Sequence, residues 1–171
     1  MKRSASPLRR LLALGGIAAA LLGSGCESSD LSKKADITSE VLICLPPDTP
    51  APSAVVRAVW FPNAKGIGST DASPVHVTGV LALAGDKLWF MAWNDPEHHF
   101  DMLHVIAYLQ AERVAISRLG TSAMLVIQSG NDSYDSFELM NGGLFGSDPV
   151  VTQDLFEKIQ ALRARNPQPD L

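Results

Sequence analysis

The densest group of side chains capable of acid–base or metal chemistry lies between positions 95 and 104. This segment reads DPEHHFDMLH and contains three of the chain's four histidines. Imidazole and carboxylate groups are ligands for zinc, so His98, His99 and His104 are the candidate metal-binding residues. If the segment were one extended strand, His98 and His104 would share a face, and His99 and Asp101 would point the other way. The spacing fits no zinc motif. We therefore expect a solvated inter-strand loop and assign no metal ligand.

Nucleophilic catalysis has weaker support in the sequence. Serines are frequent in 129–136, but no Gly-x-Ser-x-Gly elbow is present. Cys44 lies in an apolar run without a basic neighbour, whereas a reactive thiolate needs a base or a cationic setting. We expect Cys44 to be a small buried side chain, and we assign no catalytic residue and no cofactor. A small metal-dependent or hydrolytic envelope enzyme that uses the 95–104 cluster remains the alternative function.

The first 25 residues have the pattern of an export signal. A basic head that ends at Arg10 is followed by an uncharged stretch over 11–22 and the small residues 23–25. Twelve residues make a helix of about 18 Å, whereas a bilayer core of about 30 Å needs roughly 20 residues. The stretch is therefore short for a transmembrane helix and is typical of a cleavable secretory signal.

The end of this signal resembles the lipobox of bacterial lipoproteins, in which small residues precede a lipidated cysteine. The matching residues are Leu22, Gly23, Ser24, Gly25 and Cys26, with the leucine one position further from the cysteine than in the commonest form. The resemblance implies a diacylglyceryl thioether and an acylated amino group on Cys26, which would hold the protein on a membrane. Residue 27 is Glu and not Asp, which by the same resemblance indicates the outer membrane in a cell with two membranes.

Charge excludes several partners. The first 25 residues contain four of the 14 basic residues and none of the 18 acidic ones, so a mature chain of 146 residues has a net charge near −8. Nucleic-acid binding depends on cationic contacts to phosphate, and anionic lipids are recognised by basic patches. We expect no nucleic acid as a partner.

The mature chain is expected to form one domain. Residues 1–25 are the signal peptide, 26–38 the lipidated cysteine with a flexible tether, 39–165 the folded domain and 166–171 a disordered tail. A short apolar run over 41–45 ends at two prolines. Strand-like segments follow at 54–61, 75–83, 87–93, 100–108, 113–119, 123–128 and 134–140.

The period of apolar residues changes near the end of the chain. Asp148 and Pro149 form a favourable N-cap and first helical position. Val151, Leu155, Ile159 and Leu162 then recur at helical spacing. The sequence therefore predicts a mainly β fold of about six or seven antiparallel strands, followed by one C-terminal helix over 149–164 that caps the sheet.

The segment 79–90 resembles the central hairpin of GRAM-like and bacterial PH-like domains. It combines a glycine, alternating apolar residues, a Gly85-Asp86 turn, Lys87 and a leucine-x-phenylalanine ending. Segments 106–119 and 123–139, with Phe137, resemble later strands of these domains, and the resemblance covers about 54–164. It implies a PH-like, partly open barrel. Many PH domains bind phosphoinositides near the first hairpin loop, but the corresponding loop 63–74 holds Lys65 as its only cation, so phosphoinositide binding is not expected.

The expected function is therefore a non-enzymatic binding or scaffold module on a lipid anchor in the bacterial cell envelope. A protein partner in the envelope or a small ligand would occupy it. Trp60, Trp89 and Trp93 could line a ligand cleft, but at strand positions we expect them to pack in the core or at the rim.

Substitution of Cys26 tests the anchor. Because the thioether forms on the cysteine sulfur, Cys26→Ser should leave a precursor that takes up no labelled palmitate. The wild-type protein should take up the label and sediment with outer membranes in a density gradient. Labelling of the Cys26→Ser variant would contradict the assignment.

Overall fold

The computed structural model describes residues 37–68, 75–94, 96–97, 99–130, 132–141 and 146–166. The predicted signal peptide, Cys26, most of the predicted tether, His98 and all but the first residue of the predicted tail lie outside these residues.

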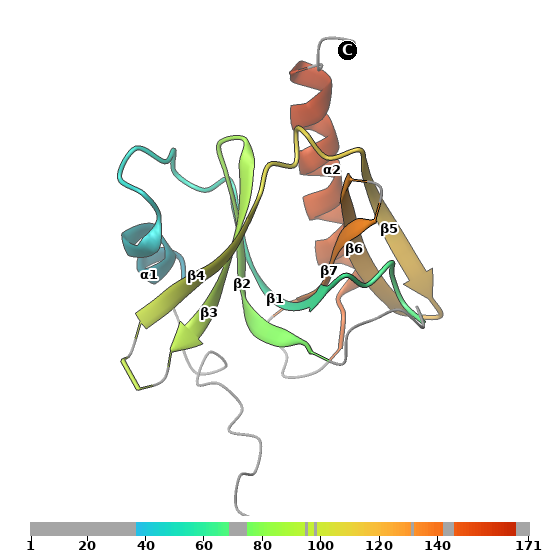
Figure 1. The fold of residues 1–171 in the computed structure, drawn as a ribbon, viewed down its shortest axis with the longest axis horizontal. Helices are drawn as coiled ribbons and strands as arrows, with labels where there is room; N and C mark the ends of the chain where they lie inside the picture. Colours follow the sequence, from blue (N-terminus) through green and yellow to red (C-terminus); the bar gives the residue numbers. More distant parts are fainter. Residues whose placement is uncertain are drawn as a thin grey trace, which may run out of the picture.

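Seven antiparallel strands form one open sheet (Figure 1). Their order is β4-β3-β2-β1-β7-β6-β5, so β4 and β5 are its two edges. The predicted mainly β architecture with a C-terminal helix is confirmed. The bounds are β1 Ala54–Pro62, β2 Val77–Ala84, β3 Lys87–Asn94, β4 His99–Ile106, β5 Arg113–Leu119, β6 Ser122–Gly130 and β7 Ser133–Met140, with helices α1 Ile37–Cys44 and α2 Pro149–Arg165.

Tight turns fix the register of two hairpins. Ala84 pairs with Lys87 across Gly85-Asp86, and Leu119 pairs with Ser122 across Gly120-Thr121. Gly85 has φ 62° and Gly120 has φ 58°, a left-handed conformation that is inexpensive only for glycine. These glycines therefore place the flanking strands in the register that keeps alternate side chains on one face.

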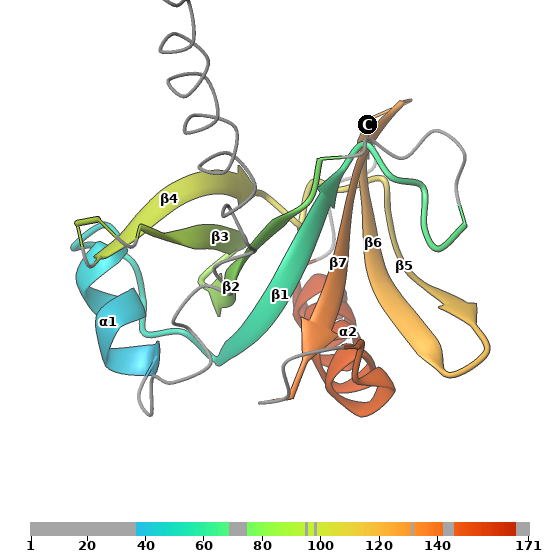
Figure 2. The same ribbon diagram turned by 90° about the horizontal axis from the view of Figure 1, so that it is seen from below.

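The inner face of the curved sheet contains the main core. Phe90 of β3 and Phe137 of β7 are both fully buried, with ring centroids 5.8 Å apart, although β2 and β1 lie between their strands in the sheet. The two halves of the sheet therefore bend toward each other, and α2 lies between them (Figure 2). Leu155 and Ile159 of α2 join this inner cluster at 2% and 0% exposure.

The start of α2 follows the predicted cap. Asp148 Oδ1 accepts hydrogen bonds from Val150 N at 2.8 Å and Val151 N at 3.2 Å, and Pro149 is the first helical residue. These bonds satisfy two backbone N–H groups that have no partner within the helix.

A second helix, α1, was not predicted. Its sequence, ITSEVLIC, has apolar residues on several sides, so the hydrophobic pattern does not identify one face. Val41 and Leu45 are buried in a second cluster, on the outer face of the sheet, with residues such as Ala82 and Met91. Packing on the sheet therefore determines the position of this helix. The helix begins at Ile37, so the last two residues of the predicted tether 26–38 are helical.

No helix among the described residues is long and apolar enough to cross a membrane.

Truncation of the buried face of α2 tests its role in the core. Leu155→Ala removes a side chain that is 2% exposed, and such changes destabilise a fold by about 2–5 kcal/mol. The melting temperature should fall by several degrees or more, whereas Lys158→Ala, on the exposed side of the same helix, should change it little. Equal melting temperatures for the two variants would show that α2 does not contribute to the core.

Candidate functional site

The structure distributes the residues of the 95–104 cluster over two separate networks. The first lies at the exposed start of β4, where His99 Nε2 is 2.8 Å from Asp101 Oδ1. Asn94 Nδ2 donates to Asp101 Oδ2 at 2.8 Å. The hydrogen bond with Asp101 raises the pKa of His99, and the hydrogen bonds from Asn94 and His99 lower the pKa of Asp101. This network joins the ends of β3 and β4.

A β-bulge changes the expected facing of the histidines. His99, Asp101 and His104 pair with Asn94, Ala92 and Phe90, which alternate along one face of β3. The register shifts between Phe90 and Met91, so the extra residue Leu103 brings His104 to the same face as His99 and Asp101. The expected solvated inter-strand loop is therefore wrong over 99–104, which belongs to β4. The bulge also changes the facing that one regular strand would give to His104.

The second network, which we call the His104 cluster, links three strands. Asp135 of β7 accepts a hydrogen bond from Trp60 Nε1 of β1 at 2.9 Å, and its Oδ2 lies 3.1 Å from His104 Nε2. The imidazole stacks on the indole of Trp60, with centroids 4.9 Å apart and 14° between the planes. Through these contacts with His104, Asp135 and Trp60 hold the edge strand β4 against the centre of the sheet.

The His104 cluster places a charge pair at the margin of the core. Asp135 is only 6% exposed, and buried carboxylates require hydrogen-bond partners. The hydrogen bond to Asp135 raises the pKa of His104, while partial burial acts in the opposite direction. An imidazole oriented by a carboxylate also forms the acid–base part of hydrolytic sites. The adjacent Ser136, however, alternates to the other face and donates its hydroxyl hydrogen to Ala64 O.

Within the described ranges, no group of three or more histidine, cysteine or acidic residues could hold a metal ion. His99 binds Asp101 and Glu97, whereas His104 binds Asp135. The fourth histidine, His76, stacks on Phe61. The three described histidines therefore have different neighbours.

The tryptophans and the cysteine considered in the sequence analysis lie in or beside the two apolar clusters. Trp60 packs partly against the inner cluster, and Trp89 and Trp93 belong to or pack on the outer one, as expected for core or rim positions. Cys44 is only partly buried, beside the outer cluster, and has no disulfide partner among the described cysteines. The prediction that Cys44 is buried is therefore wrong, because one side of α1 faces solvent.

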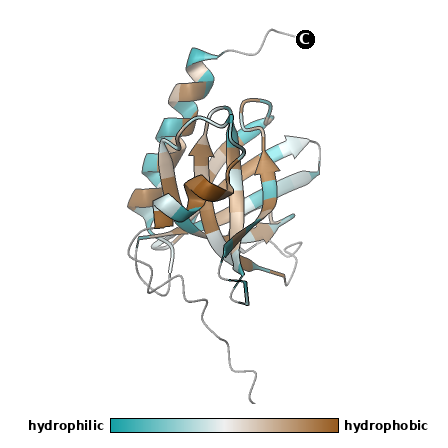
Figure 3. Ribbon diagram, turned by 90° about the vertical axis from the view of Figure 1, so that its left-hand side faces the viewer, coloured by the Kyte–Doolittle hydropathy of each residue, from teal (hydrophilic) through white to brown (hydrophobic). Residues whose placement is uncertain are grey.

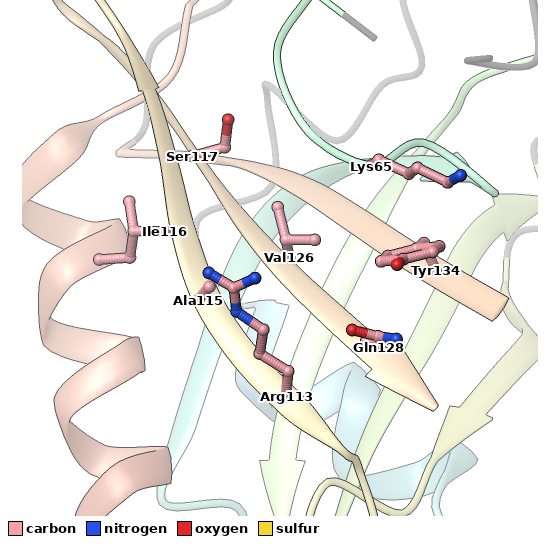
Figure 4. A pocket seen from close by; sticks show the side chains of 8 residues that line it. All are labelled: Lys65, Arg113, Ala115, Ile116, Ser117, Val126, Gln128 and Tyr134. Atoms are coloured by element: carbon pink, nitrogen blue, oxygen red, sulfur yellow. The ribbon is translucent and has the colours of Figure 1, made fainter. Parts of the chain in front are cut away.

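A polar pocket lies on the outer face of β5, β6 and β7 (Figure 4). Its volume is about 280 Å³. Arg113, Ala115 and Ser117 alternate along β5, opposite Gln128, Val126 and Met124 of β6. Figure 4 shows the guanidinium group of Arg113 extending along β5 into the pocket. The lining residues are Lys65, Arg113, Ala115, Ile116, Ser117, Val126, Gln128 and Tyr134.

The segment 63–68 after β1 forms one wall of the pocket. Asn63 N donates to Tyr134 O at 2.7 Å, and Ile67 N donates to Ser117 Oγ at 3.2 Å. Gly66 has φ 127°, and a Cβ atom there would collide with the side chain of Ser117. The close seating of this segment on β5 and β7 therefore depends on glycine at position 66.

The pocket presents hydrogen-bond donors and positive charge in an acidic protein. Lys65 Nζ lies 5.4 Å from the centroid of the Tyr134 ring. Gln128 Nε2 donates to Glu112 and to Gly130 O, at 3.1 and 3.3 Å. A guanidinium group binds carboxylates strongly because it offers paired N–H donors, so Arg113 suits an acidic or carbonyl-bearing group.

Sequence reasoning identified only Lys65 among the polar lining residues. Arg113, Gln128 and Tyr134 come from three strands whose order follows from long-range pairing. The one local signal was the outward alternation of Arg113 and Ser117 along β5, which predicts a shared face but not its neighbours.

Neither a protein-family model nor a curated protein matches this chain. The PH-like assignment therefore stays a prediction.

The raised pKa of His104 predicts a pH-dependent contribution to stability. Protonated His104 interacts best with Asp135, so its contribution is complete below the unfolded-state pKa of about 6.5 and is lost as the pH rises through the higher folded-state pKa. The loss of unfolding free energy in His104→Gln should therefore be larger at about pH 5.5 than at about pH 9. Denaturant titration at each pH measures this difference.

The partner substitution provides the control. In an Asp135→Asn background the carboxylate is absent, so His104→Gln should no longer have a pH-dependent effect. A pH dependence that persists without Asp135 would assign the effect to other groups.

Proposed function

We propose that this protein is a lipid-anchored lipoprotein of the bacterial cell envelope whose PH-like domain is a non-enzymatic binding module. The outer membrane is its proposed location. Lipid on Cys26 holds it there, and the pocket beside Arg113 receives a group from a protein partner in the envelope.

The sequence around Cys26 supports the anchor. A basic head, a short apolar stretch and three small residues precede this cysteine. More than one acyl chain is needed for stable membrane attachment, because a single chain binds only marginally. The diacylglyceryl group and the acylated amino group implied by the lipobox together meet this requirement.

The observation that carries the binding function is the pocket on the outer face of β5, β6 and β7. Its volume of about 280 Å³ is at the lower end of the roughly 300–1,000 Å³ typical of small-molecule sites. It suits one or two side chains of a partner better than a large ligand. Arg113, with the phenol group of Tyr134 in the same pocket, favours an acidic side chain or a chain terminus.

Charge reversal at Arg113 tests this function. The lipidated wild-type protein and Arg113→Glu should be crosslinked in their own membrane, purified in mild detergent and compared by quantitative mass spectrometry. A partner should be recovered with the wild-type protein and reduced at least several-fold with Arg113→Glu, because a carboxylate would repel an acidic group.

Arg165→Glu is the matched control, since it makes the same charge change at an exposed position near the end of α2. It should recover the partner as the wild-type protein does. Equal recovery with Arg113→Glu, or equal loss with both variants, would contradict a specific role for the pocket.

A further inference from the structure

Helix α1 presents apolar side chains on its solvent side as well as toward the sheet. Val41 and Leu45 are buried in the outer cluster, whereas Leu42 is 47% exposed and Ile43 is 82% exposed. Glu40 is the only charged residue of the helix. Adjacent large apolar side chains that are exposed often mark a contact surface, and the sheet covers only the opposite side of α1.

The neighbouring edge strand continues this apolar character. Helix α1 lies beside β4, as Figure 2 shows. Met102 and Val105 pair with Met91 and Trp89, which belong to the outer cluster beside α1. Both are 38% exposed. Edge strands usually carry charged residues that prevent association, but Phe100, Met102 and Val105 give this face of β4 no charge.

The position of α1 along the chain indicates what covers it. Only 11 residue steps separate Cys26 from Ile37, which limits the distance between them to about 40 Å even in a fully extended chain. The side of the domain that carries α1 faces the viewer in Figure 3, with hydrophobic colouring along the helix. This apolar surface therefore belongs to the described element that is nearest along the chain to the predicted lipid.

Tethering makes a weak contact with lipid sufficient. A short flexible linker gives an effective concentration on the order of millimolar, so little additional affinity is needed to occupy the surface. The acidic residues Glu40 and Asp48 are close in the sequence to Leu42 and Ile43, which disfavours attraction to anionic headgroups. Contact would depend on burial of apolar side chains.

We propose that Leu42 and Ile43 of α1, with Met102 and Val105 of β4, lie on the bilayer that holds the acylated Cys26. This surface orients the domain on the membrane. The inference rests on the proposed lipid anchor and adds to it a fixed orientation, in which α1 faces lipid and the other end of the domain faces away.

An environment-sensitive fluorophore can test the orientation in the full lipidated chain. In a Cys44→Ser background, Ile43→Cys would carry a nitrobenzoxadiazole label, and the protein would be reconstituted in vesicles of phosphatidylcholine and phosphatidylethanolamine. Spin-labelled lipid should quench the label at position 43. Aqueous iodide should quench the label several-fold less in the vesicles than in a reference sample, which is the soluble mature chain with Cys26→Ser in solution without detergent. High salt should not change either result.

Val150→Cys is the matched control, because Val150 is also an exposed apolar side chain, at 67%, but on α2. Its label should be open to iodide and insensitive to the spin-labelled lipid. A thermal melt of each labelled protein shows whether it is folded. We expect the label at position 43 to be tolerated, because Ile43 is 82% exposed.

Three outcomes would overturn the proposal in distinguishable ways. Equal iodide access at positions 43 and 150 would show that α1 does not face the membrane. Protection from iodide without quenching by the spin-labelled lipid would show that protein, such as a second copy, covers α1. Failure of the protein to float with the vesicles would refute the lipid anchor itself, and with it the surface.

Discussion

The open seven-stranded sheet carries apolar side chains on both of its faces, and the rest of this structure depends on shielding them from water. The inner face is closed when the two halves of the sheet bend together, so that Phe90 meets Phe137, and when α2 inserts Leu155 and Ile159 between them. Fully burying one such side chain contributes about 1.5–3 kcal/mol. On the outer face, helix α1 and the segment 63–68 each cover part of the sheet.

The exposed surfaces at these two covering segments differ in chemistry. Helix α1 covers the outer cluster around Ala82 and Met91, and its own solvent side is apolar. The segment 63–68 lies over β5 and β7 through its bonds to Tyr134 and Ser117, and the pocket beside it is polar. The proposed lipid contact uses the apolar surface, and the proposed acidic partner uses the polar, cationic one.

The His104 cluster is a consequence of the same open architecture. Edge strand β4 has one neighbour in the sheet, β3, so it needs additional contacts to stay over the inner face. The bulge at Leu103 turns His104 inward, and Asp135 receives both its imidazole and the indole of Trp60. The most conspicuous chemical cluster in the sequence therefore contributes at least partly to holding the sheet together.

The sequence by itself determined the elements whose patterns are local. Strand periodicity, the glycines at positions 85 and 120 and the Asp148 cap define the hairpins and α2, because each depends on neighbouring residues alone. The tertiary structure decided what depends on distant residues: the helical state of 37–44, the inward turn of His104 and the meeting of Lys65, Arg113 and Tyr134. Residue Asp135 illustrates the reason, since its partners at positions 60 and 104 become neighbours only after the strands from β4 to β7 pair and the sheet bends.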